Sequence, residues 1–339
     1  MIHRYKNNGY NIVLDVNSGS VHVVDDIVYD IVGCLEEKMS EAAILEKFKN
    51  QYKEEDIRTA IEECRELEEA QMLFTNDIYE NAIESFKDRP TVVKALCLHI
   101  AHDCNLACRY CFAEEGEYHG RRALMTYEVG KQALDFLIAN SGNRKNLEVD
   151  FFGGEPLMNW NVVKELVAYG RSQEKIHNKH FRFTLTTNGV LLDDDIMEFA
   201  NKEMDNVVLS IDGRKEVHDF MRPFRKGKGS YDLVVPKFQK FADSRGQQKY
   251  YARGTFTHHN LDFSEDVLHL ADLGFEQISV EPVVADEKEE YAIKKEDIPK
   301  ICEEYDKLAK EMIRRNKEGK GFNFFHFMID LTGGPCVYK

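Results

Sequence analysis

The feature that most restricts how this chain can fold is an alternation of short apolar segments with helical patterns between residues 91 and 285. The apolar segments predict strands at Val93–Ile100, Leu147–Phe152, Phe181–Thr186, Val207–Ile211, Tyr250–Thr257 and Gln277–Val283. The segments between them predict helices at Tyr127–Asn140, Trp160–Gln173, Asp194–Glu203, Tyr231–Ser244 and Ser264–Leu273. This alternation indicates an α/β fold with parallel strands, either an open doubly wound sheet or part of a barrel. In both topologies, functional groups gather at the carboxyl ends of the strands.

The first 75 residues predict a separate unit of strands followed by helices. Two β-branched runs, Tyr10–Val16 and Ser20–Asp25, flank the turn residues Asn17-Ser18-Gly19, which indicates a hairpin. Ser40 is a helix-capping residue type, and residues 55–73 carry apolar residues at roughly helical spacing. The charged segment that follows is expected to be a linker.

Charge and hydropathy limit the partners of this chain. The formal net charge of -15 opposes binding to nucleic-acid phosphates. The one basic stretch, Arg222-Pro-Phe-Arg-Lys-Gly-Lys228, is either a solvated loop or a functional segment. No window holds eighteen consecutive apolar residues, and the N-terminus lacks an apolar signal-peptide core. We therefore expect a cytoplasmic protein with neither a nucleic-acid nor a membrane partner.

Three of the eight cysteines form a constellation directly after the strand that ends at Ile100. Cys104, Cys108 and Cys111 are separated by three and then two residues. Three thiolates on one tight loop can hold three corners of a four-iron cluster. Since no fourth ligand fits cleanly nearby, one iron would keep an open coordination position for a substrate or cofactor. A structural zinc site completed by a nearby histidine is the alternative.

The cysteine loop resembles the signature of the radical S-adenosylmethionine (SAM) superfamily, in which an aromatic residue, here Tyr110, precedes the third cysteine. The resemblance implies a [4Fe–4S] cluster on Cys104, Cys108 and Cys111 whose open iron chelates the amino and carboxylate groups of SAM. One electron would then split a carbon–sulfur bond of SAM and give a 5′-deoxyadenosyl radical. The implied fold is a partial (β/α)6 barrel, similar to a TIM barrel, over residues 92–285.

Further motifs at the expected strand ends suit such a cofactor. Gly153 and Gly154 allow the backbone to approach a ligand closely, and with Glu155 and Pro156 they look like the superfamily's motif for the methionine amino group. Small polar residues follow the next two strands, namely Thr187, Asn188, Ser210 and Asp212. By resemblance, Ser210 and Arg222 contact the methionine carboxylate and the ribose, and Glu281 borders the adenine. An ordinary loop is the alternative for each of these segments.

The substrate is indicated by other parts of the chain. The N-terminal unit resembles a winged-helix-like α+β peptide-recognition element, in which a leader peptide adds as a strand to an exposed sheet edge. An inert cap or a dimerisation domain is the alternative. Together with the cysteine loop, residues 11–25, 153–156 and 333–336 resemble SPASM-type maturases of six-cysteine (SCIFF) ribosomal peptides. That resemblance implies a cysteine-rich precursor peptide, a thioether crosslink as the product, and an external one-electron donor.

The C-terminal end departs from that family. These maturases continue into a cysteine-rich region with auxiliary [4Fe–4S] clusters, whereas this chain ends three residues after Cys336. We therefore expect a truncated chain in which Cys336 is the first auxiliary ligand. Of the other four cysteines, Cys97 lies within the strand before the cysteine loop, and Cys34, Cys64 and Cys302 are expected to pack in hydrophobic cores, Cys302 on a helix over residues 298–315.

The expected division is a peptide-recognition element at 1–75, a linker at 76–91, the barrel at 92–285, and a helix plus the start of the auxiliary-cluster region at 286–339. Two other functions remain open. One is a radical oxidase similar to anaerobic sulfatase-maturing enzymes, and the other is a non-catalytic iron–sulfur or zinc-binding protein.

Overall fold

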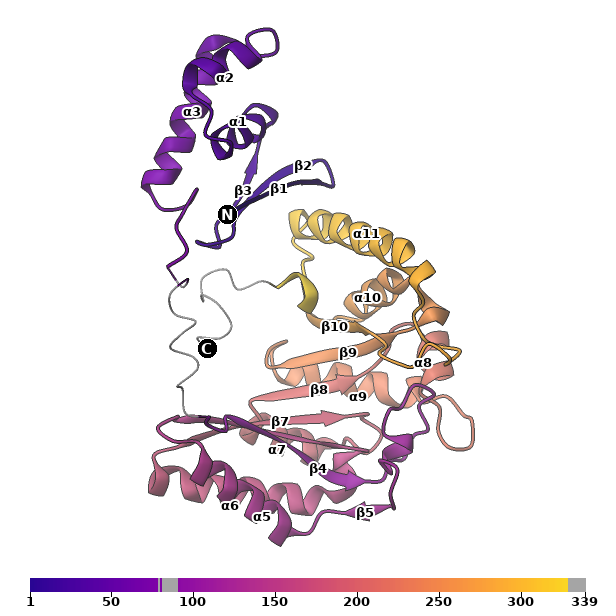
Figure 1. Ribbon diagram of the computed structural model, residues 1–339. Coiled ribbons are helices and arrows are strands. Elements are labelled where there is room, and N and C mark those ends of the chain that lie inside the picture. Colours follow the sequence, from indigo (N-terminus) through magenta and orange to yellow (C-terminus); the bar gives the residue numbers. More distant parts are fainter. Residues whose placement is uncertain (79, 81–90, 329–339) are drawn as a thin grey trace. The chain divides into compact units, whose positions relative to one another are not determined.

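The computed structural model describes residues 1–78, 80 and 91–328, which form two compact units, one within residues 1–80 and one over residues 91–328 (Figure 1). Most of the expected linker at 76–91 lies outside the described residues, and so does Cys336. Within the described ranges, no helix combines the length and the apolar character that crossing a membrane requires.

The N-terminal unit is a three-stranded antiparallel sheet followed by three helices. Its elements are β1 (Ile2–Asn7), β2 (Tyr10–Asp15), β3 (Val21–Val24), α1 (Asp26–Glu36), α2 (Glu41–Phe48) and α3 (Glu54–Glu69). The expected hairpin of β2 and β3 is confirmed, and the Ser40 side chain accepts a hydrogen bond from the Ala43 amide at the start of α2. Cys34 and Cys64 are buried with Ile31 and Ile44 in the core, as expected.

Strand β1 and helix α1 were not expected from the sequence. Only Ile2 of β1 is buried, so the strand carries almost no apolar alternation from which it could be recognised. Helix α1 begins directly after β3, where the Asp25 carboxylate accepts a hydrogen bond from the Val28 amide and satisfies one free N–H of the first turn.

The second unit is built on an eight-stranded sheet in the order β11-β10-β9-β8-β7-β6-β4-β5. The strands are β4 (Ala95–His102), β5 (Ala123–Leu124), β6 (Asn146–Gly153), β7 (His180–Thr187), β8 (Asn206–Ser210), β9 (Tyr250–Phe256), β10 (Gln277–Pro282) and β11 (Asn323–Phe324). All neighbouring pairs are parallel except the short pair β4 and β5. Because the seven parallel strands of the described sheet, β4 and β6 to β11, follow one another in sequence order, the sheet is a partial barrel and not a doubly wound sheet.

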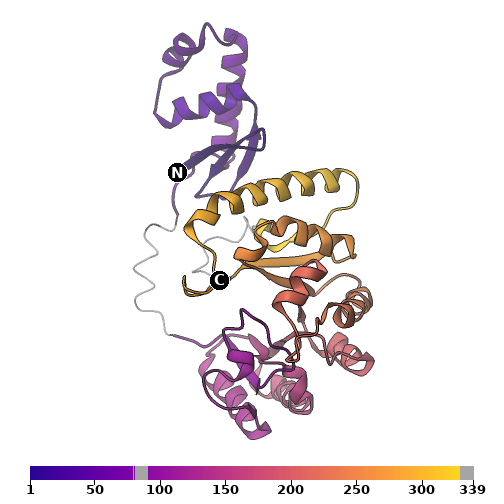
Figure 2. The same cartoon turned by 90° about the vertical axis from the view of Figure 1, so that its right-hand side faces the viewer.

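The helices of this unit are α5 (Tyr127–Asn140), α6 (Trp160–His177), α7 (Asp194–Glu203), α8 (Lys215–Met221), α9 (Tyr231–Ser244), α10 (Phe263–Asp272) and α11 (Ile298–Lys317). The crossover helices lie on one face of the sheet, as Figures 1 and 2 show. Short 3-10 turns occur at 114–116, 156–159, 258–260, 295–297 and 325–327. The expected helix near residue 300 is present, but Cys302 is exposed on α11, so its assignment to core packing was wrong. The buried positions of α11 are Ile301, Glu304 and Leu308, and Cys302 lies beside this stripe.

Burial alternates along the barrel strands because successive side chains point to opposite faces of a sheet. On β6 the side chains of Leu147, Val149 and Phe151 are buried in the core beneath the helices. The residues between them, among which is Asp150, are only partly buried and face the concave side. On β9 the same alternation leaves Arg253 on the concave face. Polar side chains such as Asp150 and Arg253 therefore lie on the concave face.

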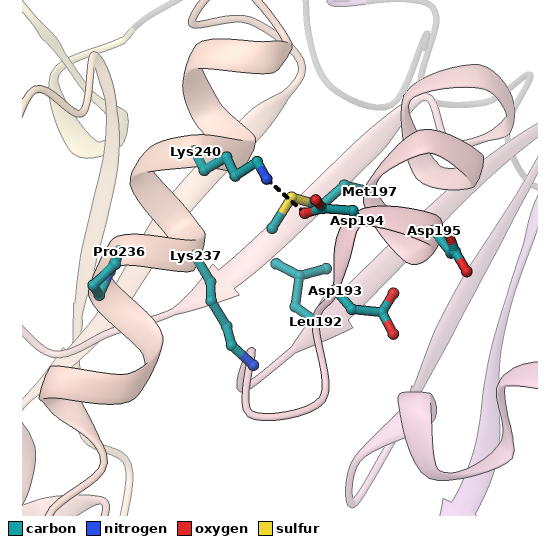
Figure 3. A pocket seen from close by; sticks show the side chains of 8 residues that line it. All are labelled: Leu192, Asp193, Asp194, Asp195, Met197, Pro236, Lys237 and Lys240. Carbon is teal, nitrogen blue, oxygen red and sulfur yellow. Dashed lines mark hydrogen bonds and ion pairs between the residues drawn. The ribbon is translucent and has the colours of Figure 1, made fainter.

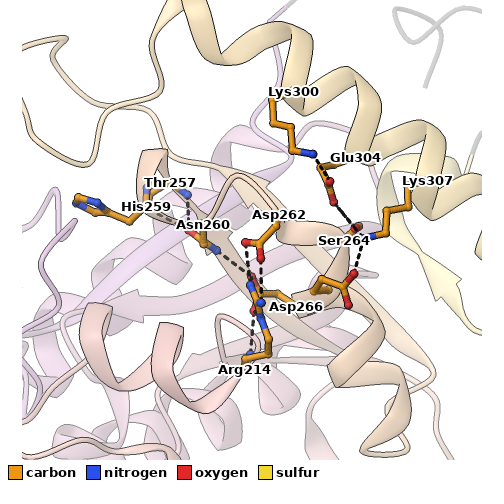
Figure 4. Close-up of polar contacts among 11 residues, drawn as sticks. Arg214, Thr257, His259, Asn260, Asp262, Ser264, Asp266, Lys300, Glu304 and Lys307 are labelled. Carbon is orange, nitrogen blue, oxygen red and sulfur yellow. Dashed lines mark hydrogen bonds and ion pairs between the residues drawn. The ribbon is translucent and has the colours of Figure 1, made fainter.

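A polar network ties together the loops at the carboxyl edge of the sheet (Figure 4). Asp266 is fully buried and accepts hydrogen bonds from Arg214 Nε at 2.8 Å and Asn260 Nδ2 at 3.0 Å. The same guanidinium pairs with Asp262 at 2.9 Å. On the neighbouring helices, the Ser264 hydroxyl donates to Glu304, which pairs with Lys300 at 2.9 Å. These contacts hold the segments after β8 and β9 in fixed positions beside the cavity described below.

Candidate functional site: a cavity beside the cysteine loop

The three cysteines of the signature line one cavity of about 360 Å³ at the carboxyl edge of the barrel. The loop that carries them begins after β4, where the Cys104 amide donates to the Asp103 carboxylate at 2.9 Å. A tight turn follows, in which the Cys111 amide donates to the Cys108 carbonyl at 3.1 Å. Three cysteines within only eight residues of the chain thus reach the wall of one cavity.

The buried thiols of Cys104 and Cys108 need nearby cations to become thiolates. Burial raises the pKa of Cys104 to about 12 and that of Cys108 to about 11. Iron ions would reverse this effect, because a bound cation deprotonates its thiol ligands. Among the described residues, no group of three histidine, cysteine or carboxylate side chains converges as the ligands of one metal ion would.

A buried network joins the cysteine loop to the loops that follow β8 and α8. The Tyr110 hydroxyl lies 2.8 Å from both carboxylate oxygens of Asp212 and accepts a hydrogen bond of 2.7 Å from Arg222 Nη1. Burial raises the pKa of Asp212 to about 6, although the nearby Arg222 opposes this shift. Arg222 lines the cavity, and its Nε is buried without a hydrogen-bond partner in the described part of the chain. An anionic ligand group such as a carboxylate would satisfy that donor.

Gly153 and Gly154 line the cavity, but their immediate contacts are with the cysteine loop. A Cβ on Gly154 would lie 2.1 Å from the Asp103 carbonyl oxygen, and one on Gly153 would lie 2.5 Å from that of Ala101. Gly153 also has a φ of +122°, a conformation that other residues rarely adopt. The two glycines therefore let the end of β6 pack directly against the backbone that carries Cys104.

Glu155 and Pro156 are fully or almost fully buried and do not line the cavity. The Glu155 carboxylate accepts hydrogen bonds from the Thr187 hydroxyl and the Asn188 amide, both at 2.8 Å. Burial raises the pKa of this carboxyl, and these hydrogen bonds oppose the shift. Glu155 thus joins the end of β6 to the end of β7. It holds Asn188, whose side-chain amide lies 3.6 Å from Cys104 Sγ, beside the loop.

The rest of the cavity wall includes most of the other residues proposed from the sequence. Thr187, Asn188, Ser210 and Glu281 line it, whereas Asp212 lies behind Tyr110. The Glu281 carboxylate accepts a hydrogen bond from the Ser279 hydroxyl and lies 2.6 Å from His326 Nε2.

Sequence reasoning missed several cavity residues, notably Arg253, Thr255 and Phe112. Arg253 lies between Ser210 of β8 and Ser279 of β10 in the strand register. The alternation along residues 250–256 places Arg253 and Thr255 on the same face of the strand. It does not tell whether that face is the concave or the convex one.

A larger hollow of about 610 Å³ lies on the outer surface between α7 and α9 (Figure 3). Its two lysines already have partners, since Lys237 Nζ donates to the Val190 carbonyl and Lys240 pairs with Asp194 at 2.7 Å. Among the described residues no cysteine lines this hollow, so we place the chemistry of this unit in the cavity beside the cysteine loop.

Comparison with known proteins finds similarity within the second unit. Residues 98–252 match the family model of the Radical SAM superfamily. The radical SAM cyclopropyl synthase TigE of Paramaledivibacter caminithermalis is 26% identical over 162 residues, which cover 42% of this chain and 34% of TigE. The cysteine-type anaerobic sulfatase-maturating enzyme of Clostridium novyi is 27% identical over 137 residues, which cover 39% of this chain and 36% of that enzyme.

Among solved structures, anSMEcpe with bound AdoMet and the Cp18Cys peptide superimposes with a TM-score of 0.60 at 19% identity. The superposition covers 70% of this chain and 64% of that chain, and at this identity it shows a shared fold. The matched segments span about a third of the length of the two curated relatives named above.

Proposed function

From the match of residues 98–252 to the family model of the Radical SAM superfamily, we propose that this chain is a radical SAM maturase that forms a cysteine thioether crosslink in a ribosomally made peptide. The observation that carries the enzymatic part is that Cys104, Cys108, Cys111 and Arg222 all line one cavity. When bound there, a [4Fe–4S] cluster and SAM supply one electron and a 5′-deoxyadenosyl radical.

The residues of the cavity have distinct roles in this proposal. The three cysteines would hold the cluster. The orphaned Nε of Arg222 pairs with the methionine carboxylate, and Tyr110 and Asp212 fix the guanidinium in place. Ser210 and Glu281 border the ribose and adenine end of the cofactor. Glu155 acts through Asn188 and the β6 turn and is therefore a positioning residue.

The peptide substrate is proposed from the N-terminal unit. Strand β3 is one edge of the antiparallel sheet, and its Val21 and Val23 side chains are 46% and 65% exposed. An extended leader peptide could add to this edge through main-chain hydrogen bonds and cover the two valines. The names of relatives also support a peptide or protein substrate, since one acts in sulfatase maturation and anSMEcpe binds a peptide.

Thioether formation replaces one C–H bond and one S–H bond of the peptide by a C–S bond. One hydrogen atom passes to the deoxyadenosyl carbon, and the other leaves as a proton and an electron. A one-electron acceptor must take up that electron, and the sequence expectation for Cys336 is that it would be the first ligand of an auxiliary cluster. Cys336 lies outside the described residues.

The enzymatic proposal is tested by anaerobic reconstitution with iron and sulfide, followed by dithionite and SAM. The expected product is 5′-deoxyadenosine from the wild type and none from Cys108→Ser. Arg222→Lys should keep the cluster but weaken SAM binding, because lysine cannot provide the Nε contact. Failure of the fully loaded wild type to release 5′-deoxyadenosine would refute the radical SAM function.

The peptide proposal needs a separate binding test with the full chain. A candidate leader peptide should bind the wild type and bind Val23→Lys more weakly, because a charge replaces the apolar contact on β3. Tyr5→Lys, a substitution on the opposite edge strand β1, is the matched control and should bind as the wild type does. Equal affinity of all three proteins would contradict leader binding at β3.

A sulfatase-maturing type of oxidation is the second candidate, favoured by the match to the Clostridium novyi enzyme. Mass spectrometry separates the two reactions. A cysteine-rich precursor that loses two hydrogens and one free thiol per crosslink supports the thioether. Conversion of a cysteine in a sulfatase peptide to an aldehyde supports the oxidase.

A further inference from the structure

The Tyr118 side chain is a buried hydrogen-bond donor that the roles assigned above leave unused. Its hydroxyl oxygen is shielded from solvent, and it has no hydrogen-bond partner within the described part of the chain. Leaving a buried donor unpaired costs free energy, and buried polar groups of native proteins nearly always have partners. An orphaned hydroxyl in this place therefore indicates a group that binds beside it.

Tyr118 ends a turn that packs against the start of the cysteine loop. The amides of Tyr118 and Gly116 both donate to the Ala113 carbonyl, at 2.9 and 2.8 Å. A Cβ on Gly116 would lie 3.0 Å from the Asp103 carbonyl carbon and 3.0 Å from Gly154 Cα, so the turn is in close contact with both segments. Tyr118 itself has a φ of +51°, which is uncommon for a tyrosine. The turn therefore holds this side chain in a fixed position despite an unfavourable backbone conformation.

Aromatic contacts place the Tyr118 ring beside the segments that carry the first and the third cysteine of the loop. The ring stacks on His99 of β4 at a centroid distance of 4.5 Å. It lies 4.9 Å from the ring of His102, two residues before the first cysteine. Phe112, the residue after the third cysteine, approaches it edge-on at 6.1 Å. The ring is thus in contact with both ends of the cysteine loop.

The Tyr118 hydroxyl is close enough to the cysteine sulfurs to respond to their charge. Burial raises the pKa of the Tyr118 phenol to about 12, so the phenol keeps its proton at pH 7. Negative charge on three nearby cysteines contributes to this shift, namely on Cys111, Cys97 and Cys104. Tyr118 does not line the cavity that would hold SAM, whereas a cluster would be bonded directly to two of these sulfurs. The cluster is therefore a better partner for the hydroxyl than SAM is.

We propose that the Tyr118 hydroxyl donates a hydrogen bond to a sulfur atom of the cluster and thereby raises the reduction potential of the cluster. The inference rests on the proposed function, because it needs a cluster on the three cysteines. Reduction adds one electron and hence one negative charge to the cluster, and the hydroxyl keeps its proton. A donor at a cluster sulfur therefore stabilises the reduced cluster more than the oxidised one.

The test uses the reconstituted full chain without SAM. Tyr118→Phe removes only the hydroxyl and keeps the ring that stacks on His99, so the fold should tolerate this substitution. The control Tyr127→Phe removes a hydroxyl at the start of helix α5, from a residue that does not line the cavity. A second control, Cys97→Ala, removes a nearby sulfur that is not a proposed cluster ligand.

The midpoint potential of the cluster is measured by redox titration followed by electron paramagnetic resonance. In Tyr118→Phe the equilibrium constant for reduction should fall about 10-fold, which for one electron is a potential about 59 mV more negative. Both controls should keep the wild-type potential. Electron–nuclear double resonance on the reduced cluster in D2O should show a coupled exchangeable deuteron that Tyr118→Phe lacks. Iron and sulfide content should be equal in all four proteins.

The outcomes separate this inference from the proposed function. Equal midpoint potentials in Tyr118→Phe and the wild type would overturn the hydrogen bond to the cluster. A shift in Cys97→Ala as large as that in Tyr118→Phe would also overturn it, because the hydroxyl would then act on the Cys97 thiol. If the wild type itself loads no [4Fe–4S] cluster, the proposed function fails irrespective of Tyr118.

Discussion

Replacing Gly154 with alanine should displace the cysteine loop from the end of β6. The added Cβ would lie 2.1 Å from the Asp103 carbonyl oxygen and 2.6 Å from its carbon, both backbone atoms that cannot rotate away. One of the two segments must therefore shift by about 1 Å, and such overpacking costs about 1–3 kcal/mol. Because both partners are backbone, we expect a value near 3 kcal/mol. In a unit of this size that lowers Tm by about 6–12 °C.

The matched control is Gly120→Ala, in the same stretch of chain, where the nearest atom to a new Cβ is the Glu117 carbonyl oxygen at an ordinary 3.4 Å. Urea unfolding and thermal melting measure stability, and iron and sulfide analysis after reconstitution measures cluster loading. Gly154→Ala should lose both stability and iron, and Gly120→Ala should lose neither. A Gly154→Ala protein with wild-type stability and iron content would show that the close packing of Gly154 against Asp103 does not position the cysteine loop.

Three further substitutions test other parts of the structure. Burial raises the pKa of Asp150 to about 6, so ionisation of this carboxyl destabilises the fold as the pH rises from about 4 to 6. In urea unfolding at pH 7, the free energy of unfolding of Asp150→Asn should exceed that of the wild type by up to about 3 kcal/mol. At pH 4 the difference should be much smaller. Asp266→Asn should lose about 2–3 kcal/mol in the same assay, because Arg214 keeps only its pair with Asp262. Tyr110→Phe should lower the free energy of unfolding by about 2 kcal/mol, because Asp212 and Arg222 lose the hydroxyl that both contact. The same substitution should raise the Kd for SAM in equilibrium binding.

Regular elements with strong periodicity were predictable from the sequence, whereas short or exposed ones were not. The bounds of α5 and α9 match those expected, because their apolar residues recur at helical spacing over fourteen residues. Helix α8, with seven residues, and β1, with one buried side chain, carry too little pattern. The choice between a barrel and a doubly wound sheet depends on strand order, which local patterns do not encode, and the observed pairing decides it.

Only part of the candidate site was predictable from the sequence, as was the case for the fold. The cysteine loop was predictable because its three thiols lie within eight residues. The contact of Gly154 with Asp103 and the position of Arg253 were not, because both depend on segments that meet only in the folded barrel. The sequence predicts the helix that carries Cys302, but not which side of this helix packs against the sheet. The exposure of Cys302 was therefore not predictable.

The most direct test of the central claim asks whether SAM binds at an iron that no cysteine ligates. Electron–nuclear double resonance on the reduced, reconstituted chain would be recorded with SAM labelled with ¹⁵N at its amino group and ¹⁷O at its carboxylate. The account predicts hyperfine coupling from both labels to a cluster held by Cys104, Cys108 and Cys111, with loss of the signal in Cys108→Ser. A loaded cluster that shows no coupling to either label would contradict it.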